Sequence, residues 1–385
     1  MRFSRYASGL FTLLLALGWA AASRAAQALS RHTSLASSAP PVLWIAKSSR
    51  LDAKCGYIDK QGKAVVALQF DDCRDFSDGL AAVKVGEKWG FIDASGKFGI
   101  EPRFEMERRV INKSRTELRP TFGDFHEGLA AVAVSGKWGY MNETGATAIE
   151  PRFEAAGPFS EDLAAVRLGD KFGYINGQGV LVIPAEYEEV REFSDGMAAV
   201  RAGGHWGYID KSGKVVIAPR FTEKTESRTY AGIKVDVVLY DFSDFHEGLA
   251  AVKVGEKWGY IDKEGKTVIS PQFERVLWFS GGLAPVAIGG REGYVDTSGK
   301  IAIKPQFEMA FTFKDAVARV ALPTKSKAGD QQWGYIDKKG DFVIPAKFAG
   351  ADDFREGMAK VNFREGKVLR NGYVDSSGNL VWREP

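Results

Sequence analysis

Histidine and cysteine are the residues of this sequence whose side chains could support the most specific chemistry, and both are few. His126 and His246 occupy the same position in two copies of the segment DFHEGLA, where they could bind a metal ion or another ligand. Neither has a second His at a metal-ligand spacing, and similar segments of the chain carry Ser at this position. We therefore expect no metal site, and we keep both residues as candidates for a binding surface.

The two cysteines, Cys55 and Cys73, are 18 residues apart. When similar segments of the chain are aligned, Cys55 stands where most copies have Trp, and Cys73 stands where another copy has Val276. Both positions are expected to face inward, so the two side chains can meet. In an oxidising compartment they can form a disulfide, and a pair of buried free thiols is the alternative.

Carboxylates are abundant, but their pattern argues against both metal binding and catalysis. Asp or Asn followed three residues later by Gly occurs nine times, as in Asp262 and Gly265. Lys or Ser commonly fills the middle of this motif, whereas a calcium loop needs several oxygen ligands. A glycosidase needs two carboxyl groups at a set separation, but most acids here recur in every unit as turn residues. We predict no catalytic residue and no cofactor.

An internal repeat must position all of these residues. The Gly of a Trp-Gly motif recurs nine times from Gly56 to Gly372, with a base spacing of 34 residues and longer spacings where residues are inserted. Four copies have lost the Trp, which is replaced by Cys55, Phe172, Glu292 and Asn371. The other copies supply the residues that we expect to form the structural core of the repeat: Trp89, Gly90, Trp138, Gly139, Trp206, Gly207, Trp258, Gly259, Trp333 and Gly334.

Each unit has the pattern of a short antiparallel meander. In the unit that runs from 248 to 280, residues 249–254 and 258–262 alternate as strands do, and 267–269 form a third strand that Pro271 is expected to end. Period two places the Trp and Tyr of the motif on one face. We expect these rings to be buried, with a ligand-binding ladder of rings as the alternative. Trp278 stands outside the motif and is the better candidate for an exposed ring.

The repeats predict an all-β fold made of nine meander units in tandem. Because an array is held together by contacts between neighbouring units, it can stay open or close into a ring. The chain begins and ends at the same phase of the repeat, whereas a ring closed by strand exchange would usually split one unit between the two ends. We therefore predict an open, curved, solenoid-like superhelix, with a closed β-propeller as the alternative.

The units resemble WG-containing repeats, a family of bacterial proteins defined by this Trp-Gly motif, over residues 41–385. This resemblance implies an extracytoplasmic or otherwise non-catalytic β-repeat protein. The units are also more weakly similar to the aromatic–glycine hairpins of cell-wall-binding repeats. Those hairpins are shorter, so their ligand-binding aromatic residues are not carried over to this sequence.

The ends and the insertions complete the domain organisation. Residues 1–26 have the charged start, apolar stretch and small-residue cleavage region of a signal peptide, and residues 27–40 are expected to be a linker. A retained membrane anchor is the alternative to cleavage. After cleavage we expect no membrane span, and a secreted or periplasmic location. Cleavage would remove three Arg and leave 49 of the 52 basic residues against 49 acidic ones, so nothing in the net charge favours nucleic acid. Insertions near 106–121 and 222–241 are candidate binding elements.

The function predicted from the sequence is a non-catalytic extracytoplasmic scaffold, for protein–protein interaction or for association with the cell envelope. A glycan-binding or cell-wall-binding module is the alternative, and an enzyme such as a glycosidase is a remote one. The partner is accordingly an unknown protein or a cell-envelope glycan. The candidate binding residues are Trp278, His126 and His246.

Overall fold

The computed structural model of this protein describes residues 54–112, 115–230, 233–323, 331–366 and 368–384. The expected signal peptide and linker lie outside these ranges. The secondary structure of the described residues consists of β-strands and the turns that join them, as an all-β fold requires. None of these residues belongs to a helix long and apolar enough to cross a lipid bilayer.

The strands form sheets from consecutive chain segments. A two-stranded sheet comes first, formed by β1 (Cys55–Ile58) and β2 (Ala64–Phe70). Eight larger sheets follow, which we call blades 1 to 8. Blades 1 to 4 are β3 (Asp72–Ser77), β4 (Leu80–Val85), β5 (Lys88–Ile92) and β6 (Phe98–Phe104); β9 (Leu129–Val134), β10 (Lys137–Asn142) and β11 (Thr147–Phe153); β12 (Ala155–Ser160), β13 (Leu163–Leu168), β14 (Lys171–Asn176) and β15 (Leu181–Tyr187); and β16 (Glu189–Val190), β17 (Met197–Ala202), β18 (His205–Asp210) and β19 (Val215–Phe221).

Blades 5 to 8 repeat this arrangement. They are β22 (Ala250–Val254), β23 (Lys257–Ile261) and β24 (Thr267–Phe273); β25 (Arg275–Val276), β26 (Leu283–Ile288), β27 (Arg291–Asp296) and β28 (Ile301–Phe307); β29 (Met309–Ala310), β30 (Ala318–Leu322), β31 (Gln332–Ile336) and β32 (Phe342–Phe348); and β33 (Gly350–Ala351), β34 (Met358–Glu365), β35 (Val368–Asp375) and β36 (Leu380–Arg383). In blades 2 and 5 the first strand is reduced to single bridges, made by Phe122 and Phe242.

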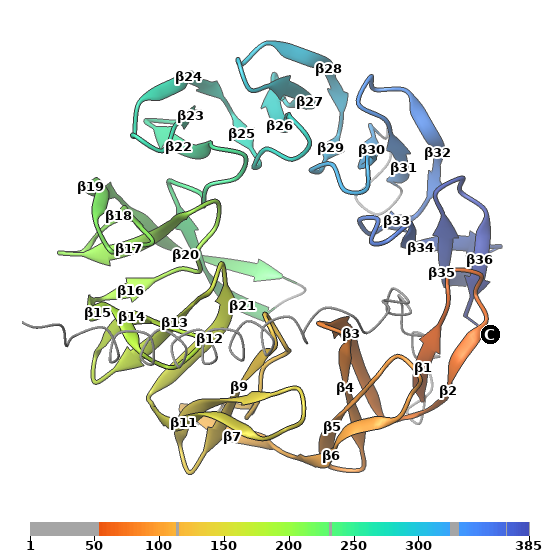
Figure 1. The fold of residues 1–385 in the computed structure, drawn as a ribbon. Coiled ribbons are helices and arrows are strands. Elements are labelled where there is room, and N and C mark those ends of the chain that lie inside the picture. Colours follow the sequence, from red (N-terminus) through yellow and green to blue (C-terminus); the bar gives the residue numbers. More distant parts are fainter. Residues whose placement is uncertain (1–53, 113–114, 231–232, 324–330, 367, 385) are drawn as a thin grey trace, which may run out of the picture. The chain divides into compact units, whose positions relative to one another are not determined.

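Each blade begins with the segment that ends the preceding sequence unit. The extended piece after Phe273 supplies β25, which pairs with β26 and so belongs to the next blade. In Figure 1 these first strands lie on the inner side of the ring, and the fourth strands, such as β28 and β32, lie on its outer side. One sequence unit therefore spans two blades, and this tethers neighbouring blades through the chain.

The predicted end of the third repeat strand at Pro271 is wrong. β24 runs through Pro271 to Phe273, and the same extension occurs at the Pro positions of other blades. The pairing of β23 with β24 shifts register between Trp258 and Tyr260, which marks a β-bulge. Proline is tolerated here because the outermost strand of a blade pairs on one side only, and a bulge removes the need for regular ladder bonds.

The core lies between the blades. In the seam between blades 4 and 5, Trp206 and Tyr208 pack against Ala250, Val252 and Ile261 of the next blade. This arrangement follows from the period of two along a strand, which places Trp and Tyr on one face and the Ile of the motif on the other. Each blade therefore presents the Trp and Tyr of its motif to the opposite face of the blade that follows. A Phe of that following blade packs on the Tyr, as Phe245 does on Tyr208 with the ring centroids 4.9 Å apart.

The prediction of an open, solenoid-like array is wrong, because the described blades close into a ring. In the internal seams, the glycine of the turn after the third strand faces the fourth strand of the preceding blade, as Gly265 faces Ile217. Gly62 of the first sheet likewise faces the fourth strand of blade 8, where the backbone carbonyl of Val381 lies nearest to it. Ile58 joins Tyr373 of blade 8 in one buried cluster. Blade 8 and the first sheet therefore meet as two neighbouring blades do, without exchanging a strand (Figure 1).

Arg355 of blade 8 adds a contact between blade 8 and blade 1 that also helps to close the ring. It occupies the position at which several blades carry a Ser that bonds to the next blade. Its Nη2 donates a hydrogen bond of 2.6 Å to the carbonyl of Phe76, and its Nη1 lies 3.0 Å from a carboxylate oxygen of Asp75. The longer side chain reaches past the two-stranded sheet to blade 1. The closed β-propeller, which was the alternative, is thus the architecture of this chain.

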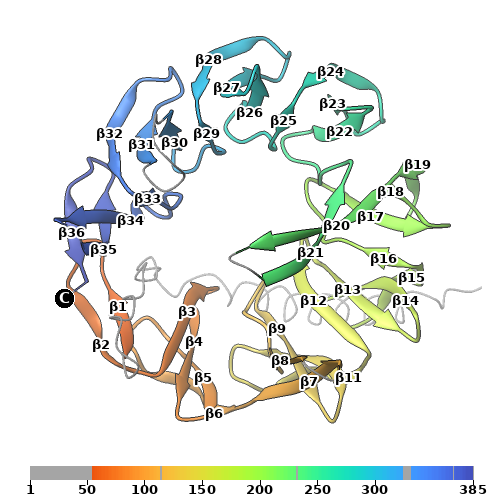
Figure 2. The same cartoon turned by 180° about the vertical axis from the view of Figure 1, so that it is seen from behind.

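Both insertions form hairpins. The first is β7 (Met106–Asn112) with β8 (Arg115–Pro120), and the second is β20 (Glu223–Tyr230) with β21 (Ile233–Tyr240). The second hairpin pairs from Glu223 with Tyr240 up to Tyr230 with Ile233, and the turn expected at 231–232 lies outside the described residues. Figure 2 shows β20 and β21 in front of the ring, extending from its rim towards the centre.

Candidate functional site

The aromatic motif serves the seams between blades. Of the motif tryptophans, Trp206, Trp89 and Trp333 are 1%, 5% and 9% exposed, and Trp138 and Trp258 are half-buried. Tyr208, which follows Trp206 by two residues, is also buried, and burial raises the pKa of its hydroxyl. Equivalent tyrosines donate a hydrogen bond to a carbonyl of the next blade, as Tyr260 does to Leu277 at 2.7 Å. The motif therefore packs the scaffold and does not present a ladder of exposed rings.

The glycine of the motif is needed because the fourth strand approaches it closely. A Cβ atom placed on Gly207 would lie 2.5 Å from the carbonyl oxygen of Ile217 and 2.7 Å from the nitrogen of Pro219. Real Cβ atoms do not approach backbone atoms this closely, so any side chain would push β19 away from β18. The other four predicted core glycines make the same close approach: Gly90, Gly139, Gly259 and Gly334.

The recurrent acidic turns bond to their own backbone. Oδ1 of Asp210 accepts a hydrogen bond of 2.6 Å from the Ser212 hydroxyl, and bonds from the amides of Ser212 and Lys214 at 2.9 and 3.1 Å. These donors, the Ser212 hydroxyl first, hold the pKa of Asp210 below its ordinary value. Among the residues that the structure describes, no group of three His, Cys, Asp or Glu side chains could hold a metal ion.

The acids in the turn after the first strand, expected from the sequence only to be turn residues, also join neighbouring blades. These side chains reach across the seam to amides of the next blade, as Glu161 does to Gly196 at 3.0 Å and Glu247 to Gly282 at 2.8 Å. The Ser before the acid does the same to a carbonyl, as Ser194 does to Phe245 at 2.7 Å. Their recurrence at one position of the repeat was the available signal for this role.

His246 and Trp278 are brought together, whereas His126 is not part of the same place. His246 belongs to the turn before β22, and Trp278 follows β25 of the next blade. The centroids of the two rings are 5.5 Å apart, with an angle of 33° between their planes. His126 occupies the corresponding turn of blade 2, where it is exposed. We call the His246–Trp278 pair the aromatic platform.

The aromatic platform is partly open to solvent. Trp278 is 38% exposed, in contrast to the buried tryptophans of the motif. Desolvation lowers the pKa of His246; the charge of Asp244 opposes this shift, and the charge of Lys314 adds to it. A neutral imidazole at neutral pH can both donate and accept a hydrogen bond. The platform thus combines a flat apolar surface with polar groups at its side.

Charged residues act on His246 of the platform, and they come from its own blade and from a later one, as with Asp244 and Lys314. A carboxylate oxygen of Asp244 lies 3.2 Å from Nη1 of Arg191, whose guanidinium carbon is 4.0 Å from the ring centroid of Tyr240. Arg191 comes from blade 4, and Lys314 comes from blade 7. The inner parts of four successive blades therefore supply aromatic, acidic and basic side chains to one region. The sequence could not show this, since these residues are far apart along the chain.

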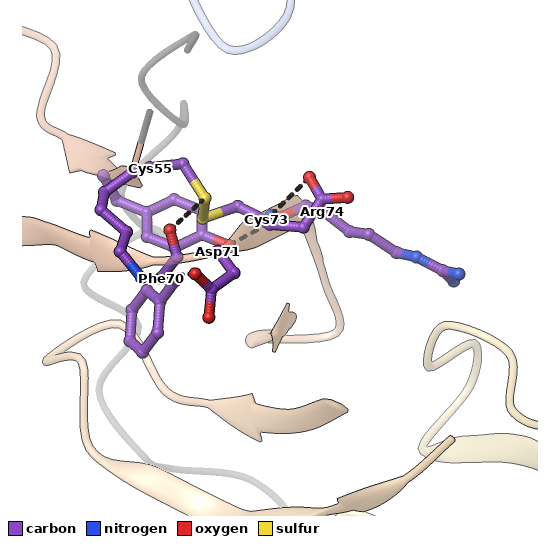
Figure 3. The surroundings of a disulfide bond; sticks show 8 residues. Cys55, Phe70, Asp71, Cys73 and Arg74 are labelled. Carbon is purple, nitrogen blue, oxygen red and sulfur yellow. Dashed lines mark hydrogen bonds and ion pairs between the residues drawn. A yellow bond between two sulfur atoms is a disulfide. The ribbon is translucent and has the colours of Figure 1, made fainter. Parts of the chain in front are cut away.

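Cys55 and Cys73 form a disulfide, which Figure 3 shows beside Phe70. The two Cα atoms are 6.2 Å apart, a separation ordinary for a disulfide. Cys55 lies on β1, opposite Phe70, and Cys73 lies on β3. The bond therefore joins the two-stranded sheet to blade 1, at a seam where other blades use a packed Trp.

Two other copies also lack the Trp. Phe172 fills its position in blade 3 with a smaller ring, and Asn371 fills it in blade 8 with an amide that donates a hydrogen bond to Glu384.

Comparison with known proteins identifies the repeat. The model of the family described as WG containing repeat matches residues 56–89, 89–106, 121–138, 138–172, 172–204, 206–223, 238–258, 258–291, 293–322 and 333–367. No curated protein matches the chain.

The chain is similar to several solved structures at low identity. One is a dihydro-heme d1 dehydrogenase, at 13% identity and a TM-score of 0.38, covering 79% of this chain and 72% of that one. Another is dipeptidyl peptidase 4 of Porphyromonas gingivalis, at 10% identity and a TM-score of 0.44, covering 81% of this chain and 59% of that one. A third is a quinonprotein alcohol dehydrogenase-like protein of Bacteroides thetaiotaomicron, at 10% identity and a TM-score of 0.30, covering 84% and 86%. The chain thus spans less than two thirds of the peptidase it resembles.

Proposed function

The chain belongs to the WG-containing repeat family, and on that premise we propose that it is an exported, non-catalytic scaffold that binds a glycan. The observation that carries the proposal is the exposure of Trp278, whose ring lies open beside His246 while the motif tryptophans serve the seams. An exposed aromatic face packs well against the apolar face of a sugar ring. Asp244 and Lys314, whose charges act on His246, can bond to sugar hydroxyls.

Two further observations support the scaffold and its export. The recurrent acids accept hydrogen bonds from backbone amides in turns and seams, which is the role of structural residues, as for Asp210 and Glu161. The disulfide between Cys55 and Cys73 fits an oxidising compartment, where such bonds persist.

The test is retention of the protein on insoluble peptidoglycan and on immobilised polysaccharides. Trp278→Ala should abolish retention on the glycan that the wild type binds, because it removes the ring on which the sugar would stack. Phe342→Ala is the matched control, since this aromatic residue is 40% exposed but lies on an outer strand. Wild-type protein that passes through every glycan matrix, or Trp278→Ala protein that is retained equally, would show the proposal to be wrong.

A second candidate function is protein–protein interaction through the hairpins. Among the described strands, β7 pairs with β8 and β20 pairs with β21 in separate two-stranded sheets, so their outer edges can accept an added strand. A hollow of about 760 Å³ lies beside the first hairpin, lined in part by Glu107, Arg119 and Trp138. Deletion of residues 228–235 spares Tyr240, which packs against Trp206 and Arg191 in the seam. This variant should leave the ring folded, because changes in loop length cost only about 0.6 kcal/mol per doubling of length. Cross-linking to envelope proteins that survives this deletion and a matching deletion in the first hairpin would contradict this role.

A further inference from the structure

Blade 6 departs from the repeat at the position that most blades fill with Trp. Glu292 stands there, opposite Ala287 on β26 and Phe307 on β28, and it is 6% exposed. Carboxylates are rarely buried unless they are paired, because desolvation of the charge is costly. A buried acid in the place of a core ring therefore calls for a specific partner.

The carboxylate of Glu292 has two partners of different kinds. One oxygen accepts a hydrogen bond from the backbone amide of Ala310, on the first strand of blade 7. The other oxygen pairs with the guanidinium of Arg275, which lies on β25 of the same blade. The Ala310 amide is a fixed part of the fold, whereas the side chain of Arg275 is 58% exposed. Arg275 therefore reaches the buried acid from the solvent side.

A small cavity surrounds this pair. Its volume is about 160 Å³, and besides Arg275, Glu292 and Ala310 its walls are mostly apolar, formed by Val276, Leu277, Pro285, Met309 and Phe311. A Trp at position 292 would fill much of this space, since Trp is far larger than Glu. Sites that take whole small molecules usually measure about 300–1,000 Å³, so this one suits a single side chain.

We propose that this cavity, the Glu292 pocket, binds the guanidinium group of an arginine on a partner protein. Charge complementarity selects a cation, because the one ionic group at the buried end is a carboxylate. Apolar walls suit the methylene stem of a long basic side chain. A planar guanidinium pairs with a carboxylate through two parallel hydrogen bonds and is weakly hydrated, which favours it over an ammonium in such a pocket.

Arg275 is then the internal occupant of the pocket. It already places a guanidinium against Glu292, and its exposed side chain can move aside when an arginine from a partner competes for the carboxylate. The pocket stays neutral in both states, which avoids a buried unpaired charge. This inference goes beyond the proposed glycan site and does not depend on it, because it concerns different residues and a different ligand.

The test uses N-acetyl-arginine amide as the probe, with the citrulline derivative as a neutral analogue of the same shape. Arg275→Ala removes the internal occupant while the pocket remains, so this variant should bind the arginine probe about tenfold or more tightly than the wild type, as titration calorimetry would measure. The probe should also raise the thermal midpoint of Arg275→Ala, because it binds only the folded form. The citrulline derivative should do neither.

Two double variants test whether the arginine probe binds at the carboxylate of Glu292. Arg275→Ala/Glu292→Trp restores the usual ring and fills the pocket, and should lose all binding of the arginine probe. Arg275→Ala/Glu292→Gln keeps the shape but removes the charge, so it provides the same test if the first double variant fails to fold. Absence of probe binding to Arg275→Ala overturns the proposal. Equal binding of the citrulline derivative, or binding that survives in a folded double variant, overturns it as well.

Discussion

Removal of the disulfide between Cys55 and Cys73 tests how the ring is held at its first seam. The bond links residues 18 apart in sequence, so it restricts the unfolded chain by closing a loop of that size. In the chain-entropy model, a loop of this length stabilises the folded state by about 3 kcal/mol. Cys55→Ala/Cys73→Ala removes the bond without burying a new polar group. We expect this variant to lose about that much free energy of unfolding.

A matched variant separates the cross-link from the packing that it replaces. Cys55→Trp/Cys73→Val installs residues used at the equivalent seam of blades 5 and 6, where Trp258 and Val276 pack against one cluster. Burial of a large apolar side chain contributes about 1.5–3 kcal/mol, so this variant should recover part of the loss. A recovery would show that the two cysteines took over a seam that packing normally closes.

The assay is urea unfolding under oxidising conditions, with and without reductant, together with amide exchange of β1. Reductant should destabilise the wild type and leave both variants unchanged. Exchange in β1 should accelerate most in Cys55→Ala/Cys73→Ala, because the two-stranded sheet loses its covalent link to blade 1. The reasoning is refuted if wild type and this variant unfold at the same urea concentration and protect β1 equally.

Three other predictions follow from single residues. Gly207→Val should lower the free energy of unfolding by more than about 3 kcal/mol, because its Cβ would meet the neighbouring strand. Gly177→Ala is the control and should be tolerated, since no atom lies within 4 Å of its new Cβ. Urea unfolding of both variants measures the difference. Arg355→Ser should lose about 1–2 kcal/mol, since Ser cannot reach the Phe76 carbonyl, and unchanged stability would exclude this contact from ring closure. Because the pKa of Asp210 is lower in the folded state, its carboxylate contributes stability that is complete above the unfolded-state pKa and is lost as pH falls through the folded-state pKa. In Asp210→Asn, the free energy of unfolding should therefore decline less steeply below about pH 4. Urea unfolding at a series of pH values measures this.

The sequence by itself determined the local structure of this protein. The spacing of the Trp-Gly motif established the period of the repeat. The alternation of side chains along Leu249–Val254 and the equivalent segments of the other repeats established strands and an all-β fold. The Asp-x-x-Gly turns were predictable because a side chain that bonds to its own backbone needs only neighbours in sequence. Alignment of the repeats also placed Cys55 and Cys73 in facing positions.

Tertiary structure alone decided closure. Whether such an array stays open or meets its own beginning depends on a small rotation accumulated over all blades, and every seam within the array has the same local pattern in either case. The deciding contacts join residues far apart in the chain, such as Arg355 with Phe76 and Gly62 with Val381. The equal phase of the two ends was compatible with a ring, because the two-stranded sheet of β1 and β2 packs against blade 8 without exchanging a strand.

The candidate sites divide in the same way. The sequence singled out His246 and Trp278 separately, but their contact arises because adjacent blades place the first turn of one beside the first strand of the next. The sequence also showed that Glu292 replaces the motif Trp in one repeat, but it did not show which groups this carboxylate contacts. Only the fold places this carboxylate against Arg275 and the amide of Ala310, because those groups come from the inner edges of two blades that pack face to face.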